Sequence, residues 1–289
     1  MYYLLKFLQS VLKNIPRKAG YFLFEFLFLC NLVLLPSERK NTLKTNLTHV
    51  LGHKPPDSMV RDVYKCYARY YFDLYQDKEK IFPSVTVSPQ FQASYDISKK
   101  LVEKNRGLII LSLHMGSWDF AGSYLSFMYP DRTNVVVERL SPAVFKWFTE
   151  SRQRFGMKVI AADDIKSMIR ALKNGEILIM VSDRDLDKKG YKLDFFGKKS
   201  YIPSGPAKLA LTCGTPLMMG AMTRDKFDPM KFIPFFDPMV LNGEPLEKTE
   251  ENALKLTAGI IGLMEKYIVQ YPEQWCLLQK VWLDENTAK

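Results

Sequence analysis

The 289-residue chain has few cysteines, few histidines and no long uninterrupted apolar run. Its four cysteines are far apart and none belongs to a CxxC pair, so the sequence argues against a zinc ribbon, a dithiol redox motif and a disulfide framework. The longest apolar run, residues 21–35, contains Glu25 and Asn31 and is shorter than the roughly 20 residues that a membrane-spanning helix needs. No internal repeat is present, which excludes a solenoid.

Positive charge is in excess. There are 41 Lys and Arg residues against 31 Asp and Glu, which gives a net charge of +10. Such an excess favours an anionic partner, which is a nucleic acid, an acidic bilayer or a phosphorylated substrate. No helix-turn-helix, zinc-finger or RNA-recognition pattern is present, so we expect no nucleic-acid partner.

The amino-terminal region is basic and amphipathic. Apolar residues recur every three or four positions over residues 2–15, which predicts a helix that ends at Pro16. The run 21–35 is expected to lie in the membrane interface or to pack on the core. Residues 1–55 carry eight Lys or Arg and two acids, a net charge of +6. We therefore predict that residues 1–55 associate with an anionic membrane surface; the alternative is an ordinary pair of core helices with solvated basic residues.

Residues 56–289 alternate between two patterns and are predicted to form one α/β domain. Short apolar segments predict strands at residues 107–113, 134–137, 158–160, 176–181 and 216–222. Helical patterns occupy residues 58–77, 117–128, 142–155, 164–173, 205–213 and 246–270. This alternation predicts a central, mainly parallel sheet wrapped by helices. Reactive groups in such sheets lie at the carboxyl ends of strands, here near residues 113 and 181.

His114 follows directly on the first predicted strand and begins the segment His114-Met-Gly-Ser-Trp-Asp119. Gly116 permits a tight turn, Ser117 can cap the next helix, and Asp119 falls in the first turn of that helix. This geometry is expected to bring Asp119 within hydrogen-bonding reach of His114, so that the carboxylate orients the imidazole as a general base. The alternative is a histidine that caps a helix and has no chemical role.

The same segment resembles the His–x4–Asp/Glu (HxxxxD) motif of glycerolipid acyltransferases, in the His-x-Gly-Asn-Trp-Glu form of the lipid A biosynthesis lauroyl/myristoyl acyltransferases. The resemblance extends over most of the chain. Within it, the segments Asp183-Arg-Asp-Leu186 and Phe195-Phe-Gly197 are similar to those of the phosphatidylinositol mannoside acyltransferases. The further matching segments are Asn46-Leu47 before Leu51-Gly52, Val181-Ser-Asp-Arg-Asp-Leu186, Asp194-Phe-Phe-Gly197, Pro203-Ser-Gly-Pro-Ala-Lys-Leu-Ala210 and Tyr271-Pro-Glu-Gln-Trp275.

The resemblance implies a glycerol-3-phosphate acyltransferase-like fold and an O-acyltransferase of lipid biosynthesis. It implies acyl transfer from acyl-CoA or acyl carrier protein to a hydroxyl of a membrane glycolipid, of phosphatidylinositol mannoside or lipid A precursor type. It also implies a peripheral or monotopic enzyme at the cytoplasmic face of the inner membrane, without metal or cofactor, in which His114 is the base and Asp119 its partner. Ser117 departs from the usual Asn, and Asp119 from the Glu of lipid A enzymes. The competing hypothesis is a non-catalytic, lipid-binding peripheral membrane protein.

Acyl transfer also needs positive charge near the thioester carbonyl, where negative charge develops. Candidates for this charge are Arg139, Arg152, Arg154 and Arg184, and we favour Arg184 because it follows the strand that ends at Val181. Asp183, which precedes Arg184, is either the salt-bridge partner of Arg184 or a further substrate-binding residue. Ser204 begins a helix whose free amides are candidates for binding a carrier phosphate; the alternative, which we favour, is a simple helix cap. Asp183 and Asp185 lack a third ligand at suitable spacing, so no metal site is predicted.

Overall fold

The computed structural model describes residues 1–34, 38–104, 107–139, 141–185, 187–239 and 247–283. Within these ranges the core is a six-stranded sheet with the strand order β3-β2-β4-β1-β7-β8. Only β8 runs antiparallel to its neighbour, and the remaining pairings are parallel. The strands are β1 (Leu108–Ser112), β2 (Thr133–Val137), β3 (Lys158–Ala161), β4 (Ile177–Val181), β7 (Leu217–Arg224) and β8 (Phe232–Met239). The predicted α/β fold with a mainly parallel sheet is therefore confirmed.

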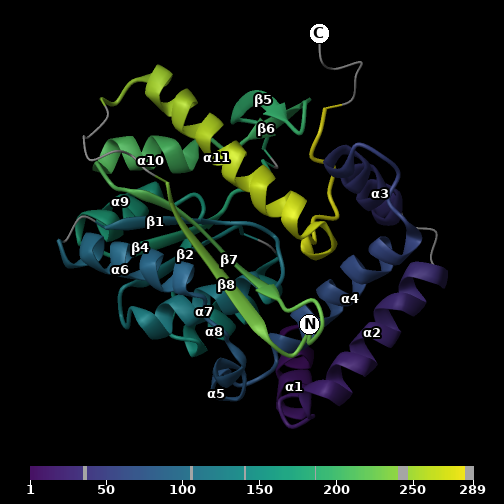
Figure 1. The fold of residues 1–289 in the computed structure, drawn as a ribbon. Helices are drawn as coiled ribbons and strands as arrows, with labels where there is room; N and C mark the ends of the chain where they lie inside the picture. The colour runs from purple at the N-terminus through teal and green to yellow at the C-terminus, as the bar shows by residue number, and fades with distance from the viewer. Residues whose placement is uncertain (35–37, 105–106, 140, 186, 240–246, 284–289) are drawn as a thin grey trace.

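Helices cover both faces of the sheet (Figure 1). Side chains alternate along β1, so Ile109 and Leu111 face one hydrophobic cluster while Leu108 and Ile110 face another. The first cluster is completed by α9 (Ile165–Lys173), α10 (Gly205–Cys213) and α11 (Glu250–Gln270). The second is completed by α6 (Pro89–Glu103), α7 (Trp118–Met128) and the end of α8 (Pro142–Arg154). Because both faces of β1 are covered, every residue of that strand is buried.

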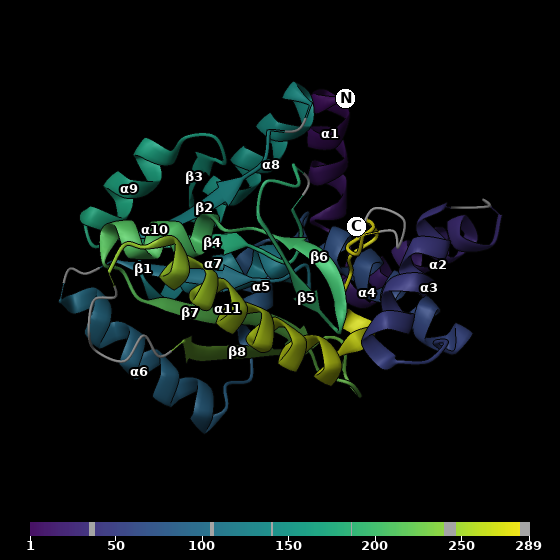
Figure 2. The ribbon, with the colours of Figure 1, turned by 90° about the horizontal axis from the view of Figure 1, so that it is seen from above.

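The amino-terminal helices gather at one end of the molecule, away from α6 and α9 (Figures 1 and 2). They are α1 (Tyr2–Leu12), α2 (Arg17–Leu34) and α3 (Glu38–Leu51), followed by α4 (Asp57–Asp73). Helix α2 packs along α4, and α1 packs against α8. Glu25, the acid inside the apolar run, pairs with Arg69 of α4 at 2.6 Å. None of the helices in the described ranges is both long and apolar enough to span a bilayer. Leu35, which ends the apolar run considered above, and Leu186, which ends one of the matching segments, lie outside the described residues.

Several elements were not anticipated from the sequence. They are helix α6, the two-stranded hairpin β5 (Tyr191–Phe195) and β6 (Lys198–Ile202), and strand β8. Strand β8 contains Pro234 and Pro238, which cannot donate ladder hydrogen bonds, and it therefore occupies an edge of the sheet. The short elements α5 (Lys78–Ile81), η1 (Phe82–Ser84) and η2 (Pro272–Gln274) complete the chain.

A buried ionic cluster joins the amino-terminal helices to the sheet. Arg224 of β7 donates from Nη2 to Asp73 Oδ2 of α4 at 2.6 Å and from Nη1 to the Tyr21 hydroxyl of α2 at 2.7 Å. Tyr21 in turn donates to Asp73 at 2.9 Å, and burial raises the pKa of Tyr21 to about 12, which keeps its proton in place. Arg17 lies 3.6 Å from the same carboxylate.

Because this cluster is shielded from water, removal of one charge leaves an uncompensated charge in the interior. We expect Asp73→Asn to lower the free energy of unfolding by about 3–5 kcal/mol. The matched control is Asp163→Asn, which removes the partner of Arg139 in an ion pair whose side chains are 63% and 64% exposed, at a cost below about 1 kcal/mol. Urea denaturation measures both values, and equal losses in the two variants would contradict the expectation.

Candidate active site

His114 lies in the turn between β1 and α7, at the carboxyl edge of the sheet. The backbone of this turn is fixed, because Gly116 N–H donates to the Gln274 carbonyl at 2.9 Å and Ser117 N–H donates to the Met222 carbonyl at 2.8 Å. Gly116 has φ +58°, and a Cβ at this position would overlap the Met222 carbonyl oxygen. Glycine is therefore required for the chain to turn here and present the imidazole, whose side chain is 18% exposed.

The partner of the imidazole is Asp183, two residues beyond the end of β4. Asp183 Oδ1 lies 2.6 Å from His114 Nδ1, and Asp183 Oδ2 accepts hydrogen bonds from the His114 backbone N–H and from Trp275 Nε1, both at 2.9 Å. Complete burial on its own would raise the pKa of Asp183, but the opposite charge of His114 and these hydrogen bonds outweigh it and lower the pKa. Asp183 is thus a buried, ionised carboxylate dedicated to His114.

This arrangement defines the state of the imidazole. A carboxylate only accepts hydrogen bonds, so the proton of the neutral ring sits on Nδ1 and points at Asp183. Nε2 has no hydrogen-bond partner among the described residues, so its lone pair can accept a proton from a substrate. The geometry is that of the His–Asp pair of a hydrolase triad, in which the acid orients the base and stabilises its protonated form.

The expected hydrogen bond between His114 and Asp119 is not formed within the described part of the chain. Asp119 is held instead by Arg152 of α8, with Nε to Oδ1 at 2.6 Å, and by the Tyr70 hydroxyl of α4, which donates to Oδ2 at 2.5 Å. The prediction of this contact is therefore corrected. Its physical reason is that Asp119 lies in the first turn of α7, where its side chain meets α4 and α8 rather than the preceding loop.

Asp119 still connects to His114 through aromatic rings. Tyr70 stacks on Trp118 with ring centroids 3.6 Å apart, and the Trp118 ring meets the His114 ring edge-on at 5.4 Å. Burial, followed by the charge of Asp119, raises the pKa of Tyr70 well above its ordinary value, so its hydroxyl remains a donor. Arg152 neutralises Asp119 in the interior. These contacts place Asp119 behind the ring that flanks the imidazole.

The other residues singled out in the sequence have separate partners. Arg184 donates to Glu138 at 2.7 Å beyond the ends of β4 and β2, and its Nε has no partner among the described residues. Arg139 pairs with Asp163 at the surface, and Arg154 donates to the Leu74 carbonyl at 3.2 Å on the side of α1. Ser204 precedes α10, but its hydroxyl makes no capping hydrogen bond. Of these four residues, only Arg184 lies next to the His114–Asp183 pair in the sequence, because it directly follows Asp183.

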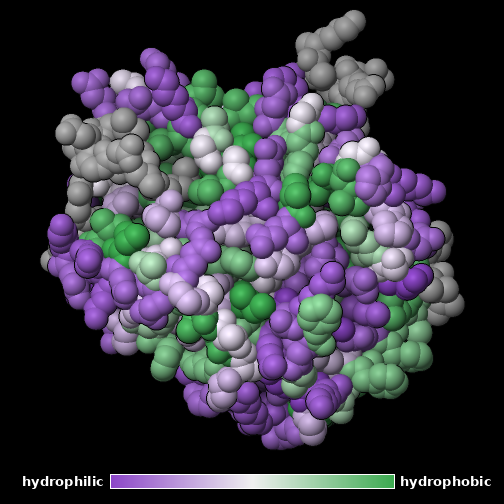
Figure 3. Space-filling view, in the orientation of Figure 1, coloured by the Kyte–Doolittle hydropathy of each residue, from purple (hydrophilic) through white to green (hydrophobic). Residues whose placement is uncertain are grey.

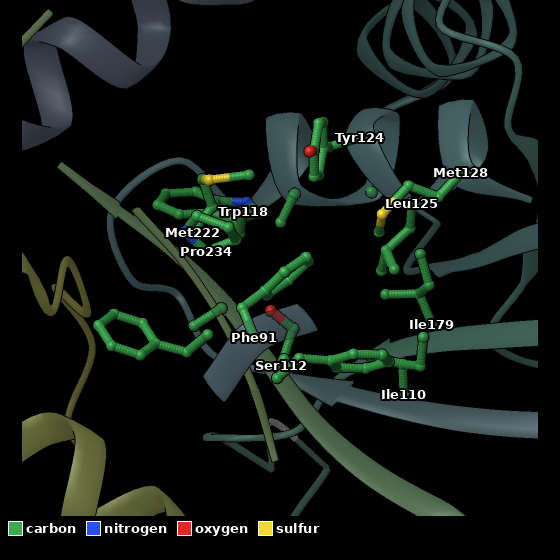
Figure 4. Close-up of a pocket in the computed structure, with 16 residues that line it drawn as sticks. Phe91, Ile110, Ser112, Trp118, Tyr124, Leu125, Met128, Ile179, Met222 and Pro234 are labelled. Carbon is green, nitrogen blue, oxygen red and sulfur yellow. The ribbon is translucent and has the colours of Figure 1, made fainter. Parts of the chain in front are cut away.

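An apolar pocket lies between α7 and the sheet (Figure 4). Trp118 lines this pocket, and its indole ring also contacts the His114 imidazole. Ser112 of β1 adds a buried hydroxyl that points into the pocket and has no hydrogen-bond partner among the described residues. The other lining residues are apolar or aromatic side chains of α6, α7 and strands β1, β4, β7 and β8, among them Phe91, Tyr124, Leu125, Ile179, Met222 and Pro234. Its lining matches a hydrocarbon chain in polarity, and its accessible volume of about 20 Å³ is that of a small group, so a long chain requires the lining side chains to move apart.

Sequence reasoning missed two contributors to this site, namely Trp275 as a donor to Asp183 and Tyr70 as a donor to Asp119. The role of Asp183 follows from the strand order, because parallel strands β1 and β4 pair Ser112 with Val181 and so carry both segments in register past the sheet edge. His114 and Asp183 each lie two residues beyond that last pair. In the described ranges no group of three or more His, Cys, Asp or Glu side chains could hold a metal ion.

Comparison with known proteins places this site in a family. The chain matches the profile of the family described as bacterial lipid A biosynthesis acyltransferase over residues 1–284. It is 26% identical over 265 residues to the phosphatidylinositol mannoside acyltransferase of Mycolicibacterium smegmatis, covering 86% of this chain and 82% of that protein. It is 25% identical over 254 residues to the protein of the same name from Mycobacterium tuberculosis, covering 83% and 76%. It is 24% identical over 188 residues to the lipid A biosynthesis palmitoleoyltransferase of Escherichia coli, covering 64% and 58%. These matches confirm the predicted enzyme class, an acyltransferase, and the chain belongs to the bacterial lipid A biosynthesis acyltransferase family.

Proposed function

We propose that this protein transfers a fatty acyl chain from a thioester donor to a hydroxyl group of a membrane glycolipid, with His114 as the general base. The observation that carries the proposal is the His114–Asp183 dyad, whose imidazole contacts Trp118 in the wall of an apolar pocket. The names of the relatives support an acceptor of phosphatidylinositol mannoside or lipid A precursor type. Acyl-CoA and acyl carrier protein are the two candidate donors, and no metal or cofactor takes part in the proposed reaction.

In the proposed reaction His114 Nε2 accepts the proton of the acceptor hydroxyl while the hydroxyl oxygen attacks the thioester carbonyl carbon. The new C–O bond forms an ester, the C–S bond breaks, and the imidazolium returns its proton to the departing thiolate. Asp183 stabilises the imidazolium between these two proton transfers. Asp119 acts indirectly, because with Arg152 and Tyr70 it fixes the Trp118 ring beside the base.

Negative charge on the carbonyl oxygen requires a donor. The amides of Met115, Gly116 and Ser117 are already hydrogen bonded within the protein, so they are not free to provide it. Arg184 directly follows Asp183 in the chain, and its Nε has no hydrogen-bond partner among the described residues. We therefore assign the stabilising charge to Arg184.

The apolar pocket is proposed to hold the acyl chain. Ala121 of α7 lines it, so Ala121→Leu adds three carbons and would occupy the space of about three methylenes, each worth about 0.8 kcal/mol on burial. We expect this variant to lower kcat/KM for a long-chain donor at least about tenfold relative to a donor two to four carbons shorter. The matched control is Ala258→Leu on the exposed side of α11, which should leave the chain-length profile unchanged. Identical profiles for the two variants would place the acyl chain elsewhere.

Membrane association is the second part of the proposal, and it places the enzyme as a peripheral protein on the cytoplasmic face of the inner membrane. Large apolar side chains are exposed on α1 and α2, and Figure 3 shows such a patch over α2. They are Tyr3, Leu4, Phe7, Val11, Phe22, Leu23, Phe26 and Leu27. Apolar stripes of this kind beside basic residues favour the interface of an anionic bilayer. The predicted division into a membrane-associating region (residues 1–55) and an acyltransferase domain (residues 56–289) remains part of this proposal.

Transfer is tested with the purified full-length protein, an acyl-CoA or an acylated carrier protein, and vesicles that contain the acceptor. Two acceptor classes are offered separately, a phosphatidylinositol mannoside and a lipid A precursor. Mass spectrometry should show one added acyl chain on one of them, and the same lipid should disappear from cells that lack the gene. Vesicle binding without transfer from either donor to either acceptor would favour the competing function, a non-catalytic lipid-binding protein.

A further inference from the structure

The apolar pocket between α7 and the sheet contains a polar group that the acyl transfer described above does not use. Ser112, the last residue of β1, is 4% exposed and lines the pocket, and its hydroxyl points into it (Figure 4). This hydroxyl has no hydrogen-bond partner among the described residues. Most buried hydroxyls in folded proteins are paired, because an unpaired one loses its hydrogen bonds to water without a replacement. The Ser112 hydroxyl is therefore available to a ligand.

The sheet fixes the position of Ser112. Its backbone pairs with Val181 of the parallel strand β4, and its carbonyl accepts a hydrogen bond from the Ser182 N–H at 3.0 Å. Side chains alternate along β1, so Ser112 shares with Leu108 and Ile110 the face that α7 covers. When the lining side chains move apart to admit an acyl chain, the hydroxyl therefore stays in the pocket wall.

The surroundings of this hydroxyl decide which group it can bind. None of the described residues in the pocket wall is charged, and most are apolar, among them Ile110, Leu125 and Ile179. A carboxylate or a phosphate would be buried here without a counter-ion, which costs far more than burial of a neutral group. The accessible volume of about 20 Å³ also suits a small group. A hydroxyl meets both conditions, and it can donate to the serine hydroxyl or accept from it.

The position of Ser112 relative to His114 indicates which part of the donor it meets. The thioester carbonyl has to lie beside the acceptor hydroxyl, which is within about 3 Å of His114 Nε2 during proton transfer. His114 does not line the pocket, and the Trp118 ring lies in the wall between them. Ser112 therefore meets the acyl chain rather than the reacting carbonyl. Because only two residues separate Ser112 from His114, their Cα atoms are at most about 7 Å apart, and the hydroxyl lies near the carbonyl end of the chain.

We propose that the preferred acyl donor carries a hydroxyl on carbon 2 or 3 of its fatty acyl chain, and that Ser112 selects it. The inference rests on the proposed acyl transfer, because it assigns the kind of chain that occupies the same pocket. An unsubstituted chain leaves the Ser112 hydroxyl unpaired in an apolar wall, whereas a hydroxyacyl chain satisfies both hydroxyls at once. Ser112 determines the choice of donor and takes no part in proton transfer.

The probes are tetradecanoyl pantetheine and its 2-hydroxy, 3-hydroxy and 12-hydroxy derivatives, because pantetheine is the part that coenzyme A and acyl carrier protein share. Binding to the full-length protein without acceptor is measured by calorimetry for wild type, Ser112→Ala and Ser112→Thr. The matched control is Ser126→Ala, which removes a buried hydroxyl of α7 that lies outside the pocket wall and donates to the Gly156 carbonyl at 2.7 Å. Because the Ser112 hydroxyl has no partner among the described residues, Ser112→Ala should keep the thermal midpoint of wild type.

We expect wild type and Ser126→Ala to bind the 2-hydroxy or the 3-hydroxy chain about tenfold more tightly than the unsubstituted chain, as for one buried hydrogen bond whose loss leaves a hydroxyl unpaired. The 12-hydroxy chain should bind no more tightly than the unsubstituted one. Ser112→Ala should lose the preference, because the hydroxyl of the chain then has no partner. Ser112→Thr keeps the hydroxyl and should keep the preference.

The proposal is overturned if wild type binds all four chains equally or favours the 12-hydroxy chain, or if Ser112→Ala retains the preference of wild type. Transfer of the same chains to the acceptor lipids is measured separately. Transfer without a preference among the chains in binding would leave the acyltransferase reaction standing and refute the role of Ser112. A preference in binding without transfer to either acceptor would support that role and count against the proposed reaction.

Discussion

Replacement of His114 by alanine is expected to lower kcat for acyl transfer by about 10²–10⁴-fold, the usual contribution of a positioned general base. The reason is geometric. Asp183 occupies Nδ1 at 2.6 Å, so Nε2 is the ring nitrogen left to accept the proton of the acceptor hydroxyl. Alanine removes that nitrogen and leaves the apolar pocket unchanged, because His114 is not among the residues that line it. KM for the acyl donor should therefore change little. Initial rates at saturating donor and acceptor measure the effect.

The matched control is His53→Ala, because His53 is an exposed histidine in the loop after α3. This variant should retain full activity. Far-UV circular dichroism and the thermal midpoint of His114→Ala should show a folded protein, since the backbone N–H of residue 114 can still donate to Asp183. Transfer at the wild-type rate by folded His114→Ala would remove the imidazole from the reaction and with it the mechanism proposed above.

Much of the fold could be predicted because burial on both faces leaves a plain signature. The segment from Leu108 to Ser112 is apolar almost throughout, since one set of its side chains meets α9, α10 and α11 and the other meets α6 and α7. The same holds for β4 and β7, whose predicted bounds differ from the observed ones by no more than two residues. A strand covered on both faces needs no partner information to be recognised.

The strands that were missed differ in the signal that their sequences carry. The strands β5 and β6 form a separate hairpin in which Lys192 and Lys199 face solvent, so they lack a continuous apolar run. Strand β8 is tolerated only because its position at the edge removes the need for the amide hydrogens that Pro234 and Pro238 lack. Sequence periodicity cannot report the edge position of β8, which is a property of the assembled sheet, whereas the apolar–polar alternation of Tyr191–Phe195 is a strand signal that was available in the sequence.

The site illustrates the same distinction. Spacing along the chain favoured Asp119, five residues after His114, whereas the sheet brings up Asp183 from 69 positions away. Parallel pairing of β1 with β4 sets this approach, and the final contact depends on side-chain packing around Trp275. Asp183 was singled out in the sequence as a neighbour of Arg184, but its role as partner of the imidazole emerges only from the strand order.

The two carboxylates can be separated by experiment. In Asp183→Asn the side-chain amide can donate to His114 Nδ1, which transfers the ring proton to Nε2 and leaves no base facing the substrate. Loss of the correct tautomer by this route costs about 10⁴-fold in a serine-protease triad, and we expect a fall of about 10³–10⁴-fold in kcat here. The conservative variant Asp183→Glu keeps a carboxylate and should retain at least tenfold more activity than Asp183→Asn.

Asp119→Asn is the matched comparison, because it makes the same chemical change in the other buried carboxylate. It touches Arg152 and Tyr70 rather than the imidazole, so its main effect should be on stability. Leaving the Arg152 charge uncompensated should lower the free energy of unfolding by about 3–5 kcal/mol, while kcat of the folded fraction falls at least tenfold less than in Asp183→Asn. The reverse order of kcat losses would mean that Asp119 reaches His114 during turnover, and Asp183 would then be a structural anchor for the turn that carries the base.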